Sequence, residues 1–166
     1  MAPRSPREVF LALVNGIAEG NPDGLPELYA EHIDVVHPFD PLRGAPLRTR
    51  EELRARMASL AGRPRERRRV GNVTIHETTD PEVIVAEFEY QGTTPGTGEP
   101  YALPAIFVMR VRDGEIVSSR DYHDHLASAR ARGQLGELFA ALSVPDAAPA
   151  PAPAPAPAGQ DDVSER

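Results

Sequence analysis

The residues best suited to chemistry gather at the end of a predicted strand, in the segment SSRDYHDH of residues 118–125. Side chains of a strand alternate between its two faces, so Ser119, Asp121 and His123 are expected to share one face. A carboxylate that faces an apolar interior has a raised pKa and can exchange protons near neutral pH. We therefore predict that Asp121 is an acid–base residue and that His123 orients a substrate carbonyl or carries a proton. The plainer alternatives are an exposed carboxylate and a histidine that only forms part of a wall.

A third candidate, His37, stands directly before Pro38 in a turn-rich segment. Opposite Asp121 it would complete a pair of groups of different basicity, as proton-transfer reactions require. The alternative is a turn histidine bonded to the backbone. Two imidazoles and a carboxylate can also bind a transition metal, so His37, Asp121 and His123 stay open as a metal site at this point. His125 is predicted to begin the final helix and is not counted among the site residues.

A predicted β-hairpin carries most of these residues. Its first strand, residues 101–111, is apolar through its middle, which is typical of a strand covered on both faces. The dipeptide Asp113-Gly114 favours a tight turn, because glycine accepts the positive φ that such turns need. The second strand, residues 115–123, ends in the polar segment.

Three helices are predicted before the strands. The sequence SPRE of residues 5–8 is a helix-capping signal, and an apolar stripe continues from it to residue 19. A short helix is predicted over residues 25–30, and a third from Thr49 until Gly62 and Pro64 end it. The other predicted elements are strands over 33–37, 70–77 and 82–90, a loop over 91–100, a helix over 126–132 and an apolar segment over 135–142.

Helices followed by several strands predict an α+β fold, in which a cone-shaped, curved antiparallel or mixed sheet carries three N-terminal helices on its concave face. The mouth of such a cone can hold a small molecule. We expect this domain to span residues 1–144. Residues 145–166 contain alternating Ala and Pro, which favours extended polyproline II, and are predicted to be a disordered tail.

The composition narrows the function classes. The chain has 166 residues, 18 basic and 25 acidic, and a net charge of −7, which argues against nucleic acid as a partner. It has no Lys for Schiff-base chemistry and no Cys for a thiol nucleophile, a disulfide or a cysteine-ligated metal. The N-terminal residues resemble no signal peptide, and no apolar run is long enough for a membrane span, so we expect a cytoplasmic protein without membrane contact.

Three segments, LYAEHIDVVHPFDPLRG, VAEFEYQGT and FVMRVRDGEIVSSRDYHD, resemble the nuclear-transport-factor-2-like superfamily. The nearest branch is the SnoaL-like proteins, which include polyketide cyclases and stand beside limonene epoxide hydrolase and ketosteroid isomerase. The resemblance covers residues 9–132 and implies the cone fold, a homodimer, and activity without cofactor or metal. Asp121 matches the acid–base carboxylate of the cyclases and the hydrolase, and His37 stands where ketosteroid isomerase holds its aspartate base.

The chain departs from two of these enzymes. Leu13 and Phe107 replace the tyrosine and aspartate with which ketosteroid isomerase stabilises its dienolate, so steroid isomerisation is not expected. Limonene epoxide hydrolase needs an arginine between two carboxylates. The segment around Glu87 and Glu89 supplies acids without that arginine.

Other residues are predicted to shape the cone or to lie outside it. Glu87 and Glu89 are expected in solvent or at a subunit contact. The arginines between residues 63 and 69 are read as a solvated strand edge, with anchoring of an acidic substrate as the weaker option. The predicted substrate-binding residues are Leu13, Tyr29, Met57, Phe88, Tyr90 and Phe107.

The sequence thus favours a cofactor-independent acid–base enzyme that acts on a hydrophobic, oxygenated small molecule. A cyclase of a polyketide-type intermediate is the first reading, with Asp121, His37 and His123 as the catalytic residues. The alternatives are an epoxide hydrolase or epoxide-opening cyclase, and a non-catalytic binding module, because this cone hosts many unrelated functions.

Overall fold

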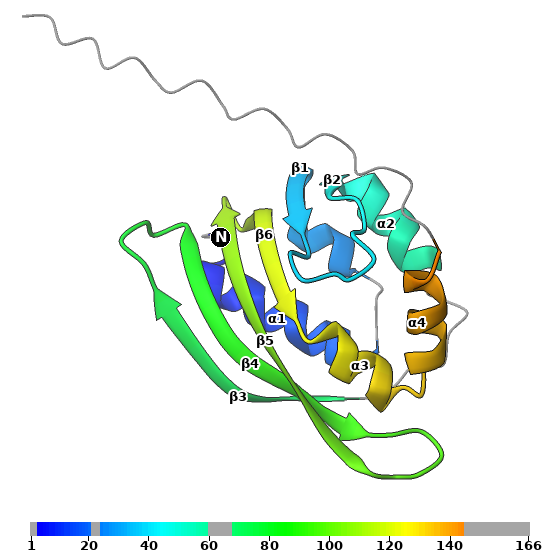
Figure 1. The fold of residues 1–166 in the computed structure, drawn as a ribbon. Helices are drawn as coiled ribbons and strands as arrows, with labels where there is room; N and C mark the ends of the chain where they lie inside the picture. Colours follow the sequence, from blue (N-terminus) through cyan, green and yellow to red (C-terminus); the bar gives the residue numbers. More distant parts are fainter. Residues whose placement is uncertain (1–2, 21–23, 60–67, 145–166) are drawn as a thin grey trace, which may run out of the picture.

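The fold is a six-stranded, strongly curved mixed sheet with helices gathered on its inner side and at one end (Figure 1). The structure, a computed structural model, describes residues 3–20, 24–59 and 68–144. The strands are β1 (Tyr29–Val36), β2 (Leu47–Thr49), β3 (Arg69–Glu77), β4 (Val83–Thr93), β5 (Pro100–Arg112) and β6 (Glu115–His123), in the order β2-β1-β6-β5-β4-β3. Only the β1–β6 pair is parallel. The predicted α+β cone is confirmed.

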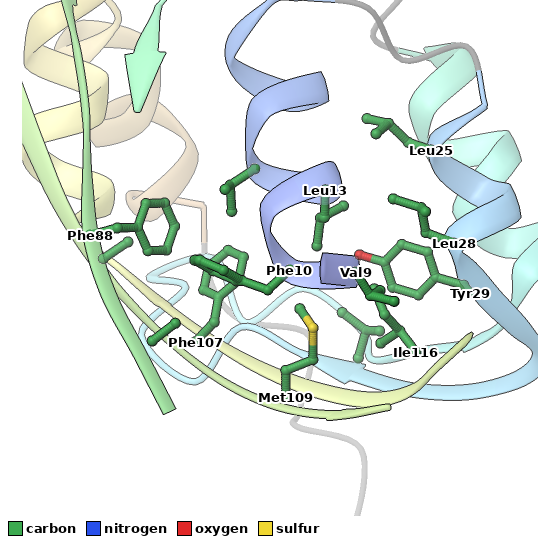
Figure 2. Packing of buried hydrophobic residues seen from close by; sticks show 14 of the residues in the cluster. Val9, Phe10, Leu13, Leu25, Leu28, Tyr29, Phe88, Phe107, Met109 and Ile116 are labelled. Carbon is green, nitrogen blue, oxygen red and sulfur yellow. The ribbon is translucent and has the colours of Figure 1, made fainter. Parts of the chain in front are cut away.

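The first helix, α1 (Pro6–Ala18), forms where the capping signal predicts it. The Ser5 Oγ accepts a hydrogen bond from the Glu8 backbone at 3.3 Å, and the Glu8 carboxylate accepts one from the Ser5 N–H at 2.8 Å. Its apolar stripe lies across β3, β4 and β5. Phe10 packs edge-on against Phe88 at 5.3 Å and Phe107 at 6.3 Å between ring centres, as Figure 2 shows. These contacts fix the helix to the inner face of the sheet.

The helix predictions need two corrections. The second predicted helix is a single 3₁₀ turn, η1 (Leu25–Leu28), because β1 already begins at Tyr29. The third is α2 (Arg50–Ser59), which packs on β1, β2 and η1 at one side of the sheet. The stop signals predicted for it, Gly62 and Pro64, lie outside the described residues. Two short helices close the domain, α3 (His125–Ala131) and α4 (Leu135–Leu142).

The β5–β6 hairpin sets the register of the candidate site. Asp113 and Gly114 both have positive φ, 53° and 82°, so the predicted tight turn is confirmed. From this turn the ladder places Phe107 opposite Asp121 and Ala105 opposite His123. A slip of one residue would turn every side chain of β6 to the other face.

The prediction that β5 is covered on both faces is wrong. Its buried side chains alternate with exposed ones, and Ile106 is 42% exposed, because helices cover one face of this single sheet only. The predicted loop is also shorter than residues 91–100, since β4 continues to Thr93. The outer face leaves room for the homodimer expected above, which stays a prediction. Residues 145–166, the predicted tail, lie outside the described residues.

No helix in the described parts of the chain is both long and apolar enough to cross a membrane.

We predict that Phe10→Ala lowers the free energy of unfolding by about 3–5 kcal/mol, because it removes the ring that joins α1 to the sheet. Phe139→Ala, at a side chain that is 55% exposed on α4, is the matched control and should cost less than about 1 kcal/mol. Urea unfolding followed by circular dichroism measures both changes. Equal costs for the two variants would contradict this account of the core.

Candidate active site

Asp121 is the buried carboxylate at the centre of the site. Its side chain points to the inner face of β6, where the residue is 6% exposed, and the Ser119 hydroxyl donates a hydrogen bond to its Oδ1. Burial raises the pKa of Asp121 to about 7, and the hydrogen bond from Ser119 opposes that rise in part. The carboxyl group can therefore gain or lose a proton near neutral pH.

His37 reaches Asp121 because β1 and β6 run in parallel. Val36 pairs with Arg120, so the next residues along the two strands are neighbours. The His37 Nε2 lies 3.8 Å from the Asp121 Oδ2, which is too long for a hydrogen bond but close enough for a small side-chain movement to form one. Burial lowers the pKa of His37, with the charges of Arg56 and His125 acting in the same direction. The imidazole is thus held neutral at physiological pH.

His123 stacks on His37. Their ring centres are 5.9 Å apart with an angle of 20° between the planes, and Phe107 meets the His123 ring edge-on at 5.2 Å. Burial, with smaller contributions from the charges of His37 and His125, lowers the pKa of His123 to about 3. A neutral imidazole can donate one hydrogen bond and accept another, so His123 can contact a substrate oxygen without carrying a positive charge.

His125 is part of the same cluster, although it was not predicted as a site residue. Its ring lies 6.5 Å from that of His37 and 5.9 Å from that of His123, both nearly perpendicular. Its Nε2 is buried and has no hydrogen-bond partner in the described part of the chain. The alternation of residues 119, 121, 123 and 125 could have indicated this position, but the helix start predicted here concealed it.

A cavity of about 570 Å³ opens beside the end of β6, and its inner wall is formed by His123 and His125. That volume lies in the range of small-molecule pockets. Asp121 and His37 do not line the cavity, whereas His123, which stacks on His37, does. Most of the remaining wall is apolar: Phe39, Pro41, Pro104, Ala105, Ile106, Leu126, Leu138 and Leu142, with Tyr122 and Asp124 adding polar groups.

The six predicted substrate-binding residues lie elsewhere than on this wall. Five of them are at most 4% exposed on the inner side of the sheet, namely Leu13, Tyr29, Phe88, Tyr90 and Phe107. Met57 is partly buried on α2 and packs against the same core. Burial raises the pKa of both Tyr29 and Tyr90, and the charge of Asp121 contributes to each rise. The two phenols and the carboxylate therefore share one interior.

The same three residues are the ones that could hold a metal ion. His37, Asp121 and His123 each offer one ligand atom, and these atoms lie within 4.8 Å of one another. Donor atoms that share a transition metal at about 2.1 Å lie roughly 3 Å apart, so the side chains would have to move closer together.

Glu87 and Glu89 lie on the outer side, as predicted. Glu87 pairs with His76 at 2.9 Å, and the Glu89 carboxylate accepts a hydrogen bond from the Asn72 side chain at 2.6 Å. Neither acid takes part in the cluster around Asp121.

Two sequence relatives share only part of the chain. The uncharacterized protein YesE of Bacillus subtilis is 38% identical over 60 residues, which is 36% of this chain and 41% of YesE. An uncharacterized PhzA/B-like protein of Pseudomonas aeruginosa, PA3332, is 35% identical over 65 residues, 39% of this chain and 46% of the relative. The chain thus spans less than half the length of these curated relatives.

Solved structures share the whole fold. A candidate isomerase from Bacillus subtilis superposes with a TM-score of 0.65 at 24% identity, over 77% of this chain and 92% of the other. A candidate polyketide cyclase from Pseudomonas putida superposes with a TM-score of 0.58 at 17% identity, over 78% and 98%. At such identities the likeness establishes the fold alone.

A family description matches most of the domain directly. The SnoaL-like domain matches residues 10–119, about two thirds of the chain, from α1 into the middle of β6. Together with the curved sheet, this match identifies the chain as a member of the SnoaL-like domain family.

Proposed function

We propose that the protein is a cofactor-independent acid–base enzyme that acts on a hydrophobic, oxygenated small molecule, with ring closure of a polyketide-type intermediate as its reaction. One observation carries the proposal: a buried carboxylate whose pKa is raised to about 7 lies beside neutral imidazoles at the wall of an apolar cavity. Perturbed titratable groups at a concave site favour function over a purely structural role.

In the proposed reaction, Asp121 in its ionised form takes up a proton from the carbon next to a substrate carbonyl by way of the imidazoles, because Asp121 itself does not line the cavity. His37, whose Nε2 lies 3.8 Å from the Asp121 Oδ2, can exchange a proton with the carboxyl group after a small movement. The neutral His123 donates a hydrogen bond to the enolate oxygen as negative charge develops there. The enolate carbon then attacks a second carbonyl of the same chain, and the proton returns to the new alkoxide.

The apolar wall contributes by shape. A flexible chain folded inside a cavity has its reacting atoms close together, which removes much of the entropic barrier to ring closure. The eight apolar residues of the wall favour a substrate that is largely hydrocarbon.

Epoxide hydrolysis is less well supported. A hydrolase of that kind needs a second carboxylate near the water-activating one, and Glu87 and Glu89 are engaged on the outer side of the sheet. A non-catalytic binding module is the alternative that the following experiment decides.

The first experiment measures proton abstraction directly. We expect the protein to accelerate exchange of the α-protons of β-tetralone, a bicyclic ketone, for deuterium in D₂O, followed by proton NMR. Asp121→Asn should slow this exchange by about 100-fold or more, because it removes the base. Asp34→Asn, at a carboxylate on β1 that pairs with Arg48, is the matched control and should retain the rate.

Two outcomes would count against the proposal. If wild-type protein binds β-tetralone, as seen in NMR line broadening, but does not accelerate exchange, the binding module is the better description. If EDTA removes the activity, the three-residue cluster acts through a metal ion and not as an acid–base group.

We predict that the exchange rate rises with pH and levels off above an apparent pKa near 7. The ionised Asp121 is the active base, and its pKa is raised to about 7 by burial. His123 contributes no second rise in this range, since burial lowers its pKa to about 3. A profile that is flat between pH 5 and 9 would rule out Asp121 as the base.

Asp121 should also make folding stability depend on pH. Its pKa rises from 3.8 in the unfolded chain to about 7 in the folded one, so the folded state binds the extra proton between these values. Stability is therefore greatest below pH 4 for this group and falls up to pH 7, by at most roughly 4 kcal/mol. Asp121→Asn cannot ionise, so its advantage in unfolding free energy over wild type should grow between pH 5 and 8. A constant difference across this range would contradict the raised pKa.

A further inference from the structure

Two buried hydrogen-bond donors on the inner face of the sheet have no partner in the described part of the chain. Tyr90 is 3% exposed, and its hydroxyl makes no hydrogen bond. The Nε of Arg68 is likewise buried and unpaired. Buried polar groups in folded proteins are almost always satisfied, because an unpaired one costs folding free energy. Two such donors together indicate an acceptor that the described residues do not supply.

Arg68 is directed toward Tyr90 by its backbone. Its N–H donates a hydrogen bond of 2.7 Å to the carbonyl of Ala18 at the end of α1, and its guanidinium carbon lies 4.5 Å above the centre of the Tyr90 ring. The next residue, Arg69, is exposed and donates to the side chain of Gln91. Arg68 is half-buried against Tyr90 and not fully solvated as predicted, whereas Arg63, Arg65 and Arg67 lie outside the described residues.

A glycine makes room for this arrangement. A Cβ at position 92 would lie 3.3 Å from the Cγ of Arg68 and closer still to the hydroxyl of Tyr101. Since Gly92 and Tyr90 are two residues apart on β4, they share a face. The bare backbone at Gly92 lets the stem of Arg68 pass beside Tyr90.

The two donors lie across the sheet from the acid–base cluster. Tyr90 is on β4 and pairs with Leu103, whereas His123 is on β6 and pairs with Ala105 of the strand between them. Two strand spacings and an offset of two residues along the strands separate the backbones of Tyr90 and His123 by roughly 12 Å. Ala105 and His123 both line the cavity, whereas Tyr90 and Arg68 do not. A rigid molecule of two fused rings spans this distance.

Electrostatics link the two ends. After burial, the charge of Arg68 is the next cause acting on the pKa of Tyr90, and it also contributes to lowering the pKa of His123. The charge of Asp121 acts on Tyr90 from the other side. Tyr90, Arg68, His123 and Asp121 therefore face one interior.

We propose that Tyr90 and Arg68 form an anchor that binds a carboxylate of the substrate at the end remote from Asp121. A phenol and a guanidinium donate hydrogen bonds and together carry a positive charge, which favours a carboxylate over a neutral carbonyl. The inference rests on the proposed function and narrows its substrate class to an apolar carbonyl compound with a terminal carboxylate.

The test compares two ligands of nearly the same shape, the anionic 2-naphthoate and the neutral 2-naphthamide, by isothermal titration calorimetry at pH 8. Wild-type protein should bind the naphthoate about tenfold more tightly or better. Tyr90→Phe and Arg68→Gln should each remove most of this preference while the affinity for the amide stays the same. Arg69→Gln, the neighbouring arginine on the outer side, is the matched control and should keep the preference.

A thermal melt separates anchoring from a structural role. Tyr90→Phe should leave the Tm unchanged or raise it, because the Tyr90 hydroxyl makes no hydrogen bond with the described residues. If Tyr90→Phe lowers the Tm and leaves naphthoate affinity intact, the hydroxyl serves the fold and the proposal is wrong. A wild type that does not prefer the naphthoate also overturns it. Asp121→Asn should retain naphthoate binding, so a failure of the proposed acid–base chemistry would show separately, in the exchange rate.

Discussion

The structure depends on keeping one carboxylate out of water. Asp121 is placed in the interior by the register of the β5–β6 hairpin, and the Ser119 hydroxyl is its only hydrogen-bond donor in the described part of the chain. Transfer of an ionised carboxylate into such surroundings is costly unless it is paired, so the group responds by holding its proton to higher pH. A protein that needed stability alone would gain by placing an apolar residue here. The free-energy cost of burying Asp121 is explained if its carboxyl group transfers a proton in the proposed reaction.

The neighbouring histidines surround the Asp121 carboxylate without forming an ion pair with it. Burial keeps both His37 and His123 uncharged, so neither forms a full ion pair that would pull the pKa of Asp121 down again. The parallel pairing of β1 with β6 brings His37 within 3.8 Å, and stacking against Phe107 and His37 fixes the His123 ring. The helix α1 closes the interior by packing Phe10 against the same aromatic group (Figure 2). Phe107 therefore belongs both to the hydrophobic core and to the candidate site. A substitution that disturbs the core packing is expected to change the geometry of the site as well.

Much of this could be predicted from the sequence, because the signals are local. The capping residues of α1, the Asp113-Gly114 turn and the alternation along β6 act within a few residues, and they fix which side chains of β6 face inward. The prediction that β5 is covered on both faces was wrong because apolar residues on its outer face, such as Ile106, do not indicate whether a second layer covers them.

The remaining features depend on contacts between distant segments. The position of His125 in the cluster follows from packing against His37, some ninety residues earlier, and its sequence context indicated a helix start instead. Arg68 looked like one of several arginines on a solvated edge. Its place over Tyr90 follows from the hydrogen bond to the end of α1, which no local pattern encodes.

The central claim is most directly tested by observing the carboxyl carbon of Asp121 in protein labelled with ¹³C-aspartate, with Asp121→Asn identifying its resonance. As the pH is raised from 3 to 9, the account predicts a titration step for this carbon centred near pH 7. A step near the ordinary value of 3.8 would mean that the carboxylate is solvated or firmly paired, and would contradict the account.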